Sequence, residues 1–245
     1  MNKLGLIGYP LGHSWSPEIH AFFLKEPCYG LYEVPNGKLM EFFRMTDLMG
    51  FNVTIPYKQD VMAYLTEIDE TAKRIGAVNT VVRRSGSFIG YNTDYIGLVQ
   101  MLRSNGIDLS GKHAVILGSG GVSKAIRAAI ETLGGTYEVA STSAKPETIT
   151  YDEMYAREGD FSILFNATPL GMSPNEDAVP ADLSKFTNLE AVIDAVANPL
   201  RTSLLFEAKT RGLKALGGFE MLVRQALAAD ELFFGQPMDH SMVRP

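Results

Sequence analysis

A glycine-rich turn, Gly118-Ser119-Gly120-Gly121, sets the strongest limit on how this chain can fold. It directly follows the apolar run 114–117, which is typical of a strand covered on both faces of its sheet. From Val122 to Leu133 apolar residues then recur with helical spacing. Gly118 permits a tight turn, Gly120 lets the backbone approach a pyrophosphate, and the helix N-terminus offers free N–H donors. The order of strand, glycines and helix therefore predicts a dinucleotide-binding unit, with a ligand-free helix-entry turn as the alternative.

Strand-like runs recur beyond this turn and alternate with helical or loop segments. They lie at residues 137–140, 163–166 and 191–196. This alternation predicts an α/β fold with a doubly wound parallel sheet of the Rossmann type. Ser123 stands where a third glycine is usual, which implies a looser packing of helix on strand. We assign residues 95–215 to this domain because the pattern changes near both bounds.

The N-terminal half predicts a second α/β domain over residues 1–94. Its expected strands are 4–8, 29–34 and 51–55, followed by a hairpin of 79–83 and 87–91 around Ser85-Gly86. Its expected helices cover Ser16 to Phe23, 38–45, a short stretch from Pro56, 68–75 and a segment that begins at Asp94. Ser16 is expected as the N-cap of the first helix, with Pro17 as its first helical residue. A last helix is expected from Glu220 to Phe234.

The residues after the strand 137–140 bear on the choice of nicotinamide cofactor. An NAD site needs an acid there for the ribose diol, whereas an NADP site favours arginine near the 2′-phosphate. The chain has Ser141-Thr142-Ser143 instead, and Glu138 lies inside the strand, where it is expected to face away from the ribose. Three hydroxyls and Lys145 suit a phosphate. NADP is therefore the favoured cofactor, and NAD stays open.

Composition excludes several other functions. The net charge of −6 argues against a nucleic-acid surface, which needs a basic face to neutralise phosphates. Cys28 is the only cysteine, so neither an intrachain disulfide nor a cysteine zinc cluster can form, and no metal site is expected. The apolar run 4–7 is too short for a signal-peptide core or a membrane span. We therefore expect a cytoplasmic protein with a small-molecule ligand and no nucleic-acid or membrane partner.

Several segments of the N-terminal half carry polar residues that the fold alone does not require. They are 12–17, 52–58, 76–80 and 90–94. Lys58 follows Pro56, which predicts a place in the first turn of a helix, where the macrodipole disfavours a cation and eases its deprotonation. A carboxylate such as Asp94 would hold this ammonium, which can donate a proton to a carbonyl oxygen as hydride arrives. Taken singly, capping explains Ser16 and Asp94, and a solvated surface explains Lys58.

Together these segments resemble the shikimate dehydrogenase family, as do the glycine-rich turn and the runs 166–172, 194–199 and 217–225. The resemblance covers nearly the whole chain. It implies a reversible, NADP-dependent reduction of 3-dehydroshikimate to shikimate, a step of aromatic amino-acid biosynthesis. It also implies that the C-terminal helix returns to the first domain, so that residues 1–94 and 216–245 hold the substrate in a cleft beside the cofactor domain.

The resemblance further implies roles for individual residues. Lys58 matches the general acid/base of the family, and Asp94 matches its partner. The residues expected at the substrate are Ser14, Ser16, Thr54, Asn79 and Gln225. The residues expected at the cofactor are Gly118, Ser119, Gly120, Gly121, Ser141, Thr142, Ser143, Thr168 and Met172.

Two departures from the family pattern leave other functions open. The family carries a tyrosine before Asn-Pro that helps to hold the substrate carboxylate, and this chain has Ala197 there. Losing such a hydrogen bond costs roughly 1.5 to 3 kcal/mol of binding. Family members that use NADP often show Asn-Arg-Thr where Ser141-Thr142-Ser143 stands. A quinate or aminoshikimate dehydrogenase, NADP- or NAD-linked, is therefore a second hypothesis, and a non-catalytic metabolite-binding regulator is a third. The protein is expected as a monomer or a homodimer.

Overall fold

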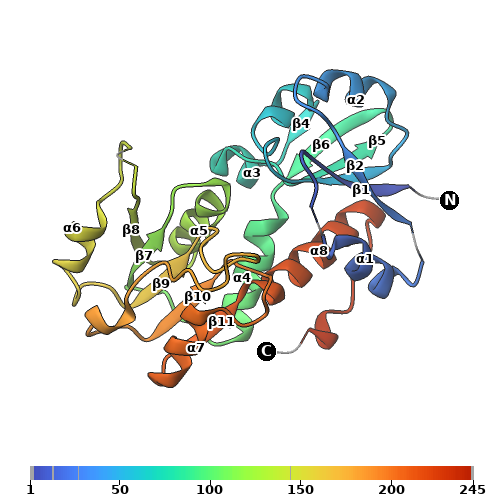
Figure 1. Cartoon of the computed structure of the whole chain (residues 1–245). Coiled ribbons are helices and arrows are strands. Elements are labelled where there is room, and N and C mark those ends of the chain that lie inside the picture. Colours follow the sequence, from blue (N-terminus) through green and yellow to red (C-terminus); the bar gives the residue numbers. More distant parts are fainter. Residues whose placement is uncertain (1–2, 13, 27, 144, 244–245) are drawn as a thin grey trace. The chain divides into compact units, whose positions relative to one another are not determined.

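The computed structural model describes residues 3–12, 14–26, 28–143 and 145–243 (Figure 1). Contacts divide the chain into two compact units, of which unit 1 comprises Met1–Gly97 and Val223–Arg244 and unit 2 comprises Leu98–Leu222 with Pro245. Each unit contains one sheet, and both sheets include parallel strands, so the predicted α/β class is confirmed. Within the described residues, every helix is too short or too polar to cross a membrane.

Unit 1 has a six-stranded mixed sheet in the order β2-β1-β3-β5-β6-β4. The strands are β1 (Leu4–Gly8), β2 (Tyr29–Glu33), β3 (Gly50–Val53), β4 (Glu67–Ile68), β5 (Thr80–Arg84) and β6 (Ser87–Tyr91). The helices are α1 (Ser16–Leu24), α2 (Leu39–Met45), the 3-10 helix η1 (Asp60–Tyr64), α3 (Glu70–Ile75) and the start of α4 (Thr93–Ser104). β1 runs parallel to β2 and β3, whereas β5 runs antiparallel to β3 and β6. The predicted hairpin therefore forms the antiparallel half of this sheet.

Alternating residues of unit 1 build one core on each face of its sheet. Ile7 and Phe51 pack with residues of α2, η1 and α3. Leu4 packs on the other side with residues of helix α8 (Gly218–Phe234). A Cβ on Gly50 would lie 2.3 Å from the ring of Phe233, so only glycine lets α8 approach β3 this closely. The C-terminal helix is thus part of the core of unit 1.

Unit 2 has a five-stranded parallel sheet in the order β11-β10-β9-β7-β8. The strands are β7 (His113–Leu117), β8 (Thr136–Ala140), β9 (Ile163–Asn166), β10 (Ala191–Asp194) and β11 (Lys214–Gly217). The helices are α5 (Gly121–Thr132), α6 (Tyr151–Tyr155), the 3-10 helix η2 (Leu183–Lys185) and α7 (Ser203–Thr210). The strand order reverses at β7, which lies between β8 and β9, and ligands of doubly wound sheets bind at this kind of switch point. The predicted Rossmann-type sheet is confirmed.

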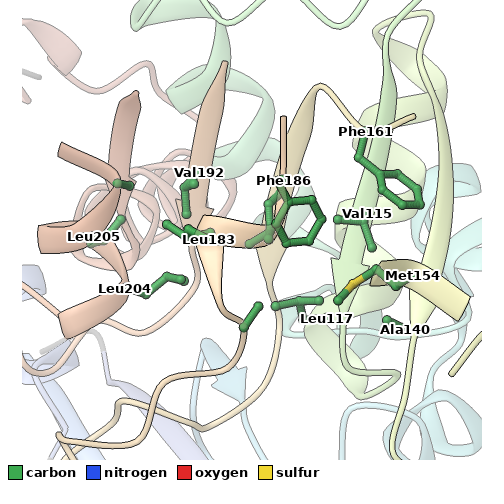
Figure 2. Close-up of a cluster of buried hydrophobic side chains, with 13 residues drawn as sticks. Val115, Leu117, Ala140, Met154, Phe161, Leu183, Phe186, Val192, Leu204 and Leu205 are labelled. Carbon is green, nitrogen blue, oxygen red and sulfur yellow. The ribbon is translucent and has the colours of Figure 1, made fainter. Parts of the chain in front are cut away.

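A hydrophobic cluster joins this sheet to α6, η2 and α7 (Figure 2). Its strand residues are apolar and fully buried, as expected for a parallel sheet covered on both faces. The side chains labelled in Figure 2 are Val115, Leu117, Ala140, Met154, Phe161, Leu183, Phe186, Val192, Leu204 and Leu205. This core fixes the strands whose carboxyl ends carry the glycine-rich turn and the polar residues that follow β8, β9 and β10.

Several predicted helix starts need correction. α1 begins at Ser16 with Trp15 as its N-cap, so Ser16 is not the capping residue. α4 begins at Thr93, and the side chain of Asn92 accepts a hydrogen bond from the Tyr95 N–H, so Asn92 rather than Asp94 caps this helix. No helix starts at Pro56, because the Tyr57 N–H closes a turn onto Thr54 O and a 3-10 helix follows only at Asp60.

Candidate active site

The candidate site of unit 1 is built around an ion pair between Lys58 and Asp94. Lys58 Nζ lies 2.6 Å from Asp94 Oδ2, and the two side chains are 18% and 14% exposed. Asp94 is the second residue of α4. Because Asn92 caps this helix, the carboxylate of Asp94 is not needed for capping. Residues separated by 36 positions are thus brought together, still in partial contact with solvent.

Lys58 lies in a turn between β3 and η1 and not in the first turn of a helix. The predicted effect of a helix macrodipole on its ammonium therefore has no structural basis. The backbone fixes its position instead, since the carbonyl oxygen of Lys58 accepts a hydrogen bond of 2.7 Å from the Val78 N–H. Asp94 then sets the direction of the side chain.

Asn79 and Gln225 are buried and lie next to each other, with exposures of 3% and 7%. Asn79 Nδ2 donates to Gln225 Oε1 at 3.4 Å. The Oδ1 of Asn79 accepts from the Thr93 N–H at 2.6 Å, and the Thr93 hydroxyl donates to Gln225 Oε1 at 3.3 Å. The start of β5, the start of α4 and the helix α8 therefore converge on one cluster of amides and hydroxyls, which suits a polyhydroxylated ligand.

A buried series of hydrogen bonds supports this cluster. The sequence alone did not predict a role for most of the residues that form it. The Tyr29 hydroxyl donates to Asn52 Oδ1 at 2.7 Å, and Asn52 Nδ2 donates to Thr80 Oγ1 at 2.9 Å. The hydroxyls of Thr80 and Thr93 are 2.9 Å apart. The one local signal was Asn52 itself, because an amide between Phe51 and Val53 interrupts an apolar strand.

Ser14, Ser16 and Thr54 follow the carboxyl ends of β1 and β3. Ser14 and Thr54 line a pocket of about 310 Å³, together with Leu6, Tyr9, Pro10, Leu11, Gly12 and Ile55. Ser14 Oγ accepts from the Ser16 N–H at 3.2 Å, and Ser16 is buried. Since Trp15 is the N-cap of α1, capping does not account for the Ser16 hydroxyl.

The glycine-rich turn of unit 2 has the shape that a pyrophosphate requires. Gly118 has φ +93°, and a Cβ there would lie 2.8 Å from Thr168 Cγ2. At Gly120 and Gly121 an added Cβ would meet nothing within 4 Å, so the backbone there borders open space. Gly120 is the N-cap of α5 and provides no side-chain cap. The first N–H groups of α5 are therefore suited to bind phosphate oxygens.

The loop after β8 carries the residues expected near the ribose. Ser141 is buried, and its Oγ accepts from the Ser143 N–H at 3.3 Å, whereas Thr142 is exposed. Lys145 Nζ donates to Ser119 Oγ at 2.9 Å, which links this loop to the glycine turn. Glu138 is bound by Arg157 at 2.6 and 2.8 Å. Its carboxylate is therefore engaged in an ion pair with Arg157.

Thr168 is held in place by the end of β9. Its hydroxyl donates to Asn166 Oδ1 at 2.6 Å, and Asn166 Nδ2 donates to Asp194 Oδ1 at 2.9 Å. Asp194 is buried and also accepts from the Thr202 hydroxyl at 2.6 Å. Burial raises the pKa of Asp194, and these hydrogen bonds oppose the rise. Met172 lies four residues after Thr168 and is exposed. Ala197 has no hydroxyl group with which to contact a ligand.

Known proteins resemble this chain over its full length. The family described as shikimate dehydrogenase substrate binding domain matches residues 6–81. A shikimate dehydrogenase (NADP(+)) from Clostridium beijerinckii is 40% identical over 261 residues, which span 100% of this chain and 96% of that protein.

Solved structures extend this likeness to the fold. Shikimate 5-dehydrogenase from Thermus thermophilus, in complex with NADP(H) and shikimate, is 32% identical with a TM-score of 0.88 over 99% of this chain and 97% of that one. Quinate dehydrogenase from Corynebacterium glutamicum, in complex with NAD, is 28% identical with a TM-score of 0.86 over 99% and 96%. The chain described here belongs to the shikimate dehydrogenase family.

Proposed function

We propose that this protein is an oxidoreductase that interconverts 3-dehydroshikimate and shikimate with NADP. The observation that carries this proposal is the Lys58–Asp94 pair at 2.6 Å beside a buried set of amides and hydroxyls. A lysine in this setting can exchange a proton with a ring oxygen, and the amide–hydroxyl cluster can bind neighbouring ring hydroxyls. Membership of the family and its NADP-dependent relatives support the same reaction.

In the direction of reduction, the Lys58 ammonium donates its proton to the carbonyl oxygen of the substrate while the carbonyl carbon receives hydride. NADPH supplies that hydride when it is bound. In the reverse direction the Lys58 amine accepts the proton of the hydroxyl, so Lys58 is the general acid and base. Asp94 accepts a hydrogen bond from Lys58 and keeps the ammonium aimed. Charge that develops on the substrate oxygen is then stabilised by a donor that is already in place.

The binding roles follow from the placement of the remaining residues. We assign the substrate hydroxyls to Thr54, Asn79 and Gln225, and the carboxylate to Ser14 and Ser16. We assign the cofactor phosphates to residues 118–121 and 141–143, with Thr168 and Met172 toward the nicotinamide. Residues 1–94 and 216–245 form the proposed substrate domain, and residues 95–215 form the cofactor domain.

The preference for NADP depends on Lys145. An ammonium has three N–H donors, so its hydrogen bond to Ser119 Oγ leaves capacity for a phosphate oxygen. An NAD site needs a carboxylate that accepts hydrogen bonds from the ribose diol. The Glu138 carboxylate binds Arg157 instead, so we do not assign it to that diol. A quinate or aminoshikimate dehydrogenase is the second candidate, because Ala197 removes a hydroxyl that the family uses on the carboxylate.

The test is a panel of shikimate, quinate and aminoshikimate, each with NADP and NAD, in which kcat/KM is measured from the absorbance of the reduced cofactor. We expect the highest value for shikimate with NADP. A higher value for quinate or aminoshikimate would assign the chain to the second candidate, and a higher value with NAD would overturn the role of Lys145. Binding of shikimate without turnover under any cofactor would instead indicate a regulator.

A further inference from the structure

Two ionisable side chains, His20 of α1 and Asp230 of α8, are buried together in unit 1 and have no part in the chemistry above. His20 Nδ1 and Asp230 Oδ1 are 2.7 Å apart, and neither side chain is exposed. Among the described residues, His20 Nε2 and Asp230 Oδ2 have no hydrogen-bond partner. A buried pair with unsatisfied atoms stabilises a fold less well than apolar side chains of the same size. Its presence therefore points to a role other than stability.

The imidazole of His20 lies flat against the ring of Tyr29. The ring centroids are 4.0 Å apart and the planes differ by 10°. Because Asp230 binds one ring nitrogen, the imidazole cannot rotate without losing that hydrogen bond. The orientation of the Tyr29 ring is thus set by a helix residue 201 positions further along the chain, which no local sequence pattern records.

Tyr29 in turn is linked through Asn52 to the backbone of Asn79, a proposed substrate ligand. Its hydroxyl donates to Asn52 Oδ1, and Asn52 Nδ2 donates to the backbone carbonyl of Asn79 at 3.3 Å. Ser16 precedes His20 by one helical turn, so the two side chains share a face of α1, and both are buried. Burial raises the pKa of Tyr29, and the charge of Asp230 adds to the rise.

We propose that His20 and Asp230 are positioning residues that hold the Tyr29 phenol, and through Asn52 the backbone of Asn79, in place for the substrate, and that the same pair fixes the face of α1 that carries Ser16. This inference rests on the proposed function, because it takes Ser16 and Asn79 as substrate ligands. Among the described residues, neither His20 nor Asp230 forms a hydrogen bond or ion pair with Lys58 or Asp94. It therefore acts on substrate binding and leaves the proton transfer unchanged.

The experiment compares Tyr29→Phe, Asp230→Asn and a matched control, Glu231→Gln. Glu231 is the next residue of α8 and also binds an imidazole, with His240 Nε2 at 3.1 Å, but this pair is partly exposed, and in the described part of the chain neither residue bonds to Tyr29. We expect KM for shikimate to rise about tenfold in Tyr29→Phe and about threefold to tenfold in Asp230→Asn, as for the loss of one hydrogen bond. kcat, KM for NADP and all constants of Glu231→Gln should stay within about twofold.

The double variant separates positioning from general stability. If Asp230 acts through the Tyr29 phenol, Asp230→Asn should change KM for shikimate much less in the Tyr29→Phe background than in the wild type. Independent, additive changes in KM would overturn the proposal, and so would a loss of kcat without a change in KM. Thermal unfolding of each variant identifies any that fail to fold, and Tyr29→Phe keeps the ring that stacks on His20.

Amide hydrogen exchange of the enzyme without ligands tests the same link apart from the reaction. Asp230→Asn should speed exchange in the first turn of α1, where the Ser16 N–H is bound by Ser14 Oγ, and Glu231→Gln should not. If wild type fails to turn over shikimate but exchange rises only in Asp230→Asn, the proposed function fails and the positioning link stands. Unchanged exchange in Asp230→Asn overturns the link, whatever the activity.

Discussion

The candidate sites of the two units differ in what forms them. In unit 1 the proposed ligands of the substrate are side chains, and those of Asn79 and Gln225 are buried and hydrogen-bonded to each other. In unit 2 the proposed pyrophosphate site at the glycine turn is backbone, with Gly120 and Gly121 bordering open space. Amides and hydroxyls held in a buried network can discriminate one ring substituent from another, whereas backbone N–H groups at a helix start bind any pyrophosphate. Unit 1 should therefore be sensitive to loss of side-chain atoms, and unit 2 to their addition.

The largest effect is expected from Lys58→Ala. Removing the proposed general acid and base should lower kcat by about a hundredfold to ten-thousandfold, while the affinity for NADPH stays unchanged because Lys58 belongs to unit 1. Steady-state turnover of shikimate and a fluorescence titration with NADPH measure the two quantities. Lys3→Ala is the control, since Lys3 also pairs with an aspartate, Asp47, but both side chains are exposed. Equal turnover of Lys58→Ala and Lys3→Ala would remove Lys58 from the mechanism.

The next effect tests the claim that unit 2 is sensitive to added atoms. In Gly120→Ala the new methyl group meets nothing within 4 Å and the backbone φ is −78°, so the fold should tolerate it. The same methyl group would stand where the backbone must approach the pyrophosphate, at a cost of about 1–3 kcal/mol in cofactor binding. We expect the Kd for NADPH to rise about tenfold to a hundredfold with an unchanged Tm.

Gly118→Ala is the matched variant for that experiment. Its φ of +93° and the 2.8 Å contact with Thr168 Cγ2 make the substitution strained in the free protein. It should lower Tm as well as affinity, whereas Gly120→Ala should lower affinity alone. If both variants bound NADPH as wild type does, the turn would be a plain helix entry.

Sequence predicted most strands of both units and missed β4 and β11, which are short or only partly buried. Buried parallel strands are continuous apolar runs and the glycine turn is contiguous, so local patterns were enough to predict β7, β8 and β9. Most misplaced helix starts were off by one or two residues because adjacent polar residues compete to cap, as with Asn92 and Asp94, whereas the helix expected from Pro56 is a turn that leads to η1 at Asp60.

The polar network of unit 1 lay beyond such patterns. Tyr29 and Asn52 are 23 positions apart, and His20 and Asp230 are 210 apart. Only the folded chain brings these residues together, so no periodicity in the sequence records them. The family resemblance predicted that Ser16 and Asn79 bind the substrate, but it did not predict which residues hold them in place.

A smaller effect concerns Lys145, whose ammonium donates a hydrogen bond to Ser119 of the glycine turn. Lys145→Ala should raise KM for NADP about tenfold and leave KM for NAD within about twofold, because only NADP carries the 2′-phosphate. Lys112→Ala is the control, since Lys112 precedes the amino-terminal end of β7, opposite to the end that carries the glycine turn, and pairs with Glu190. A parallel loss with both cofactors would mean that Lys145 only supports the loop through Ser119.

The smallest effect tests whether unit 2 also depends on a buried polar side chain. Burial raises the pKa of Asp194 above that of the unfolded chain, so the folded protein holds this proton to a higher pH. Below the ordinary pKa of aspartate, Asp194 therefore does not lower the free energy of unfolding. As pH rises from that value to the raised pKa, ionisation favours the unfolded chain, so the free energy of unfolding falls. In urea unfolding across the acid range, Asp194→Asn should gain stability relative to wild type within that interval.

Asp182→Asn is the control. Its stability relative to wild type should change with pH in the opposite direction, because hydrogen bonds from Ser184 lower the pKa of exposed Asp182. If the difference in stability between Asp194→Asn and wild type does not vary with pH, burial of the Asp194 carboxylate carries no desolvation cost. The Asn166–Asp194 contact would then support Thr168 at no cost in stability, and the two units would differ more clearly in their dependence on buried polar side chains.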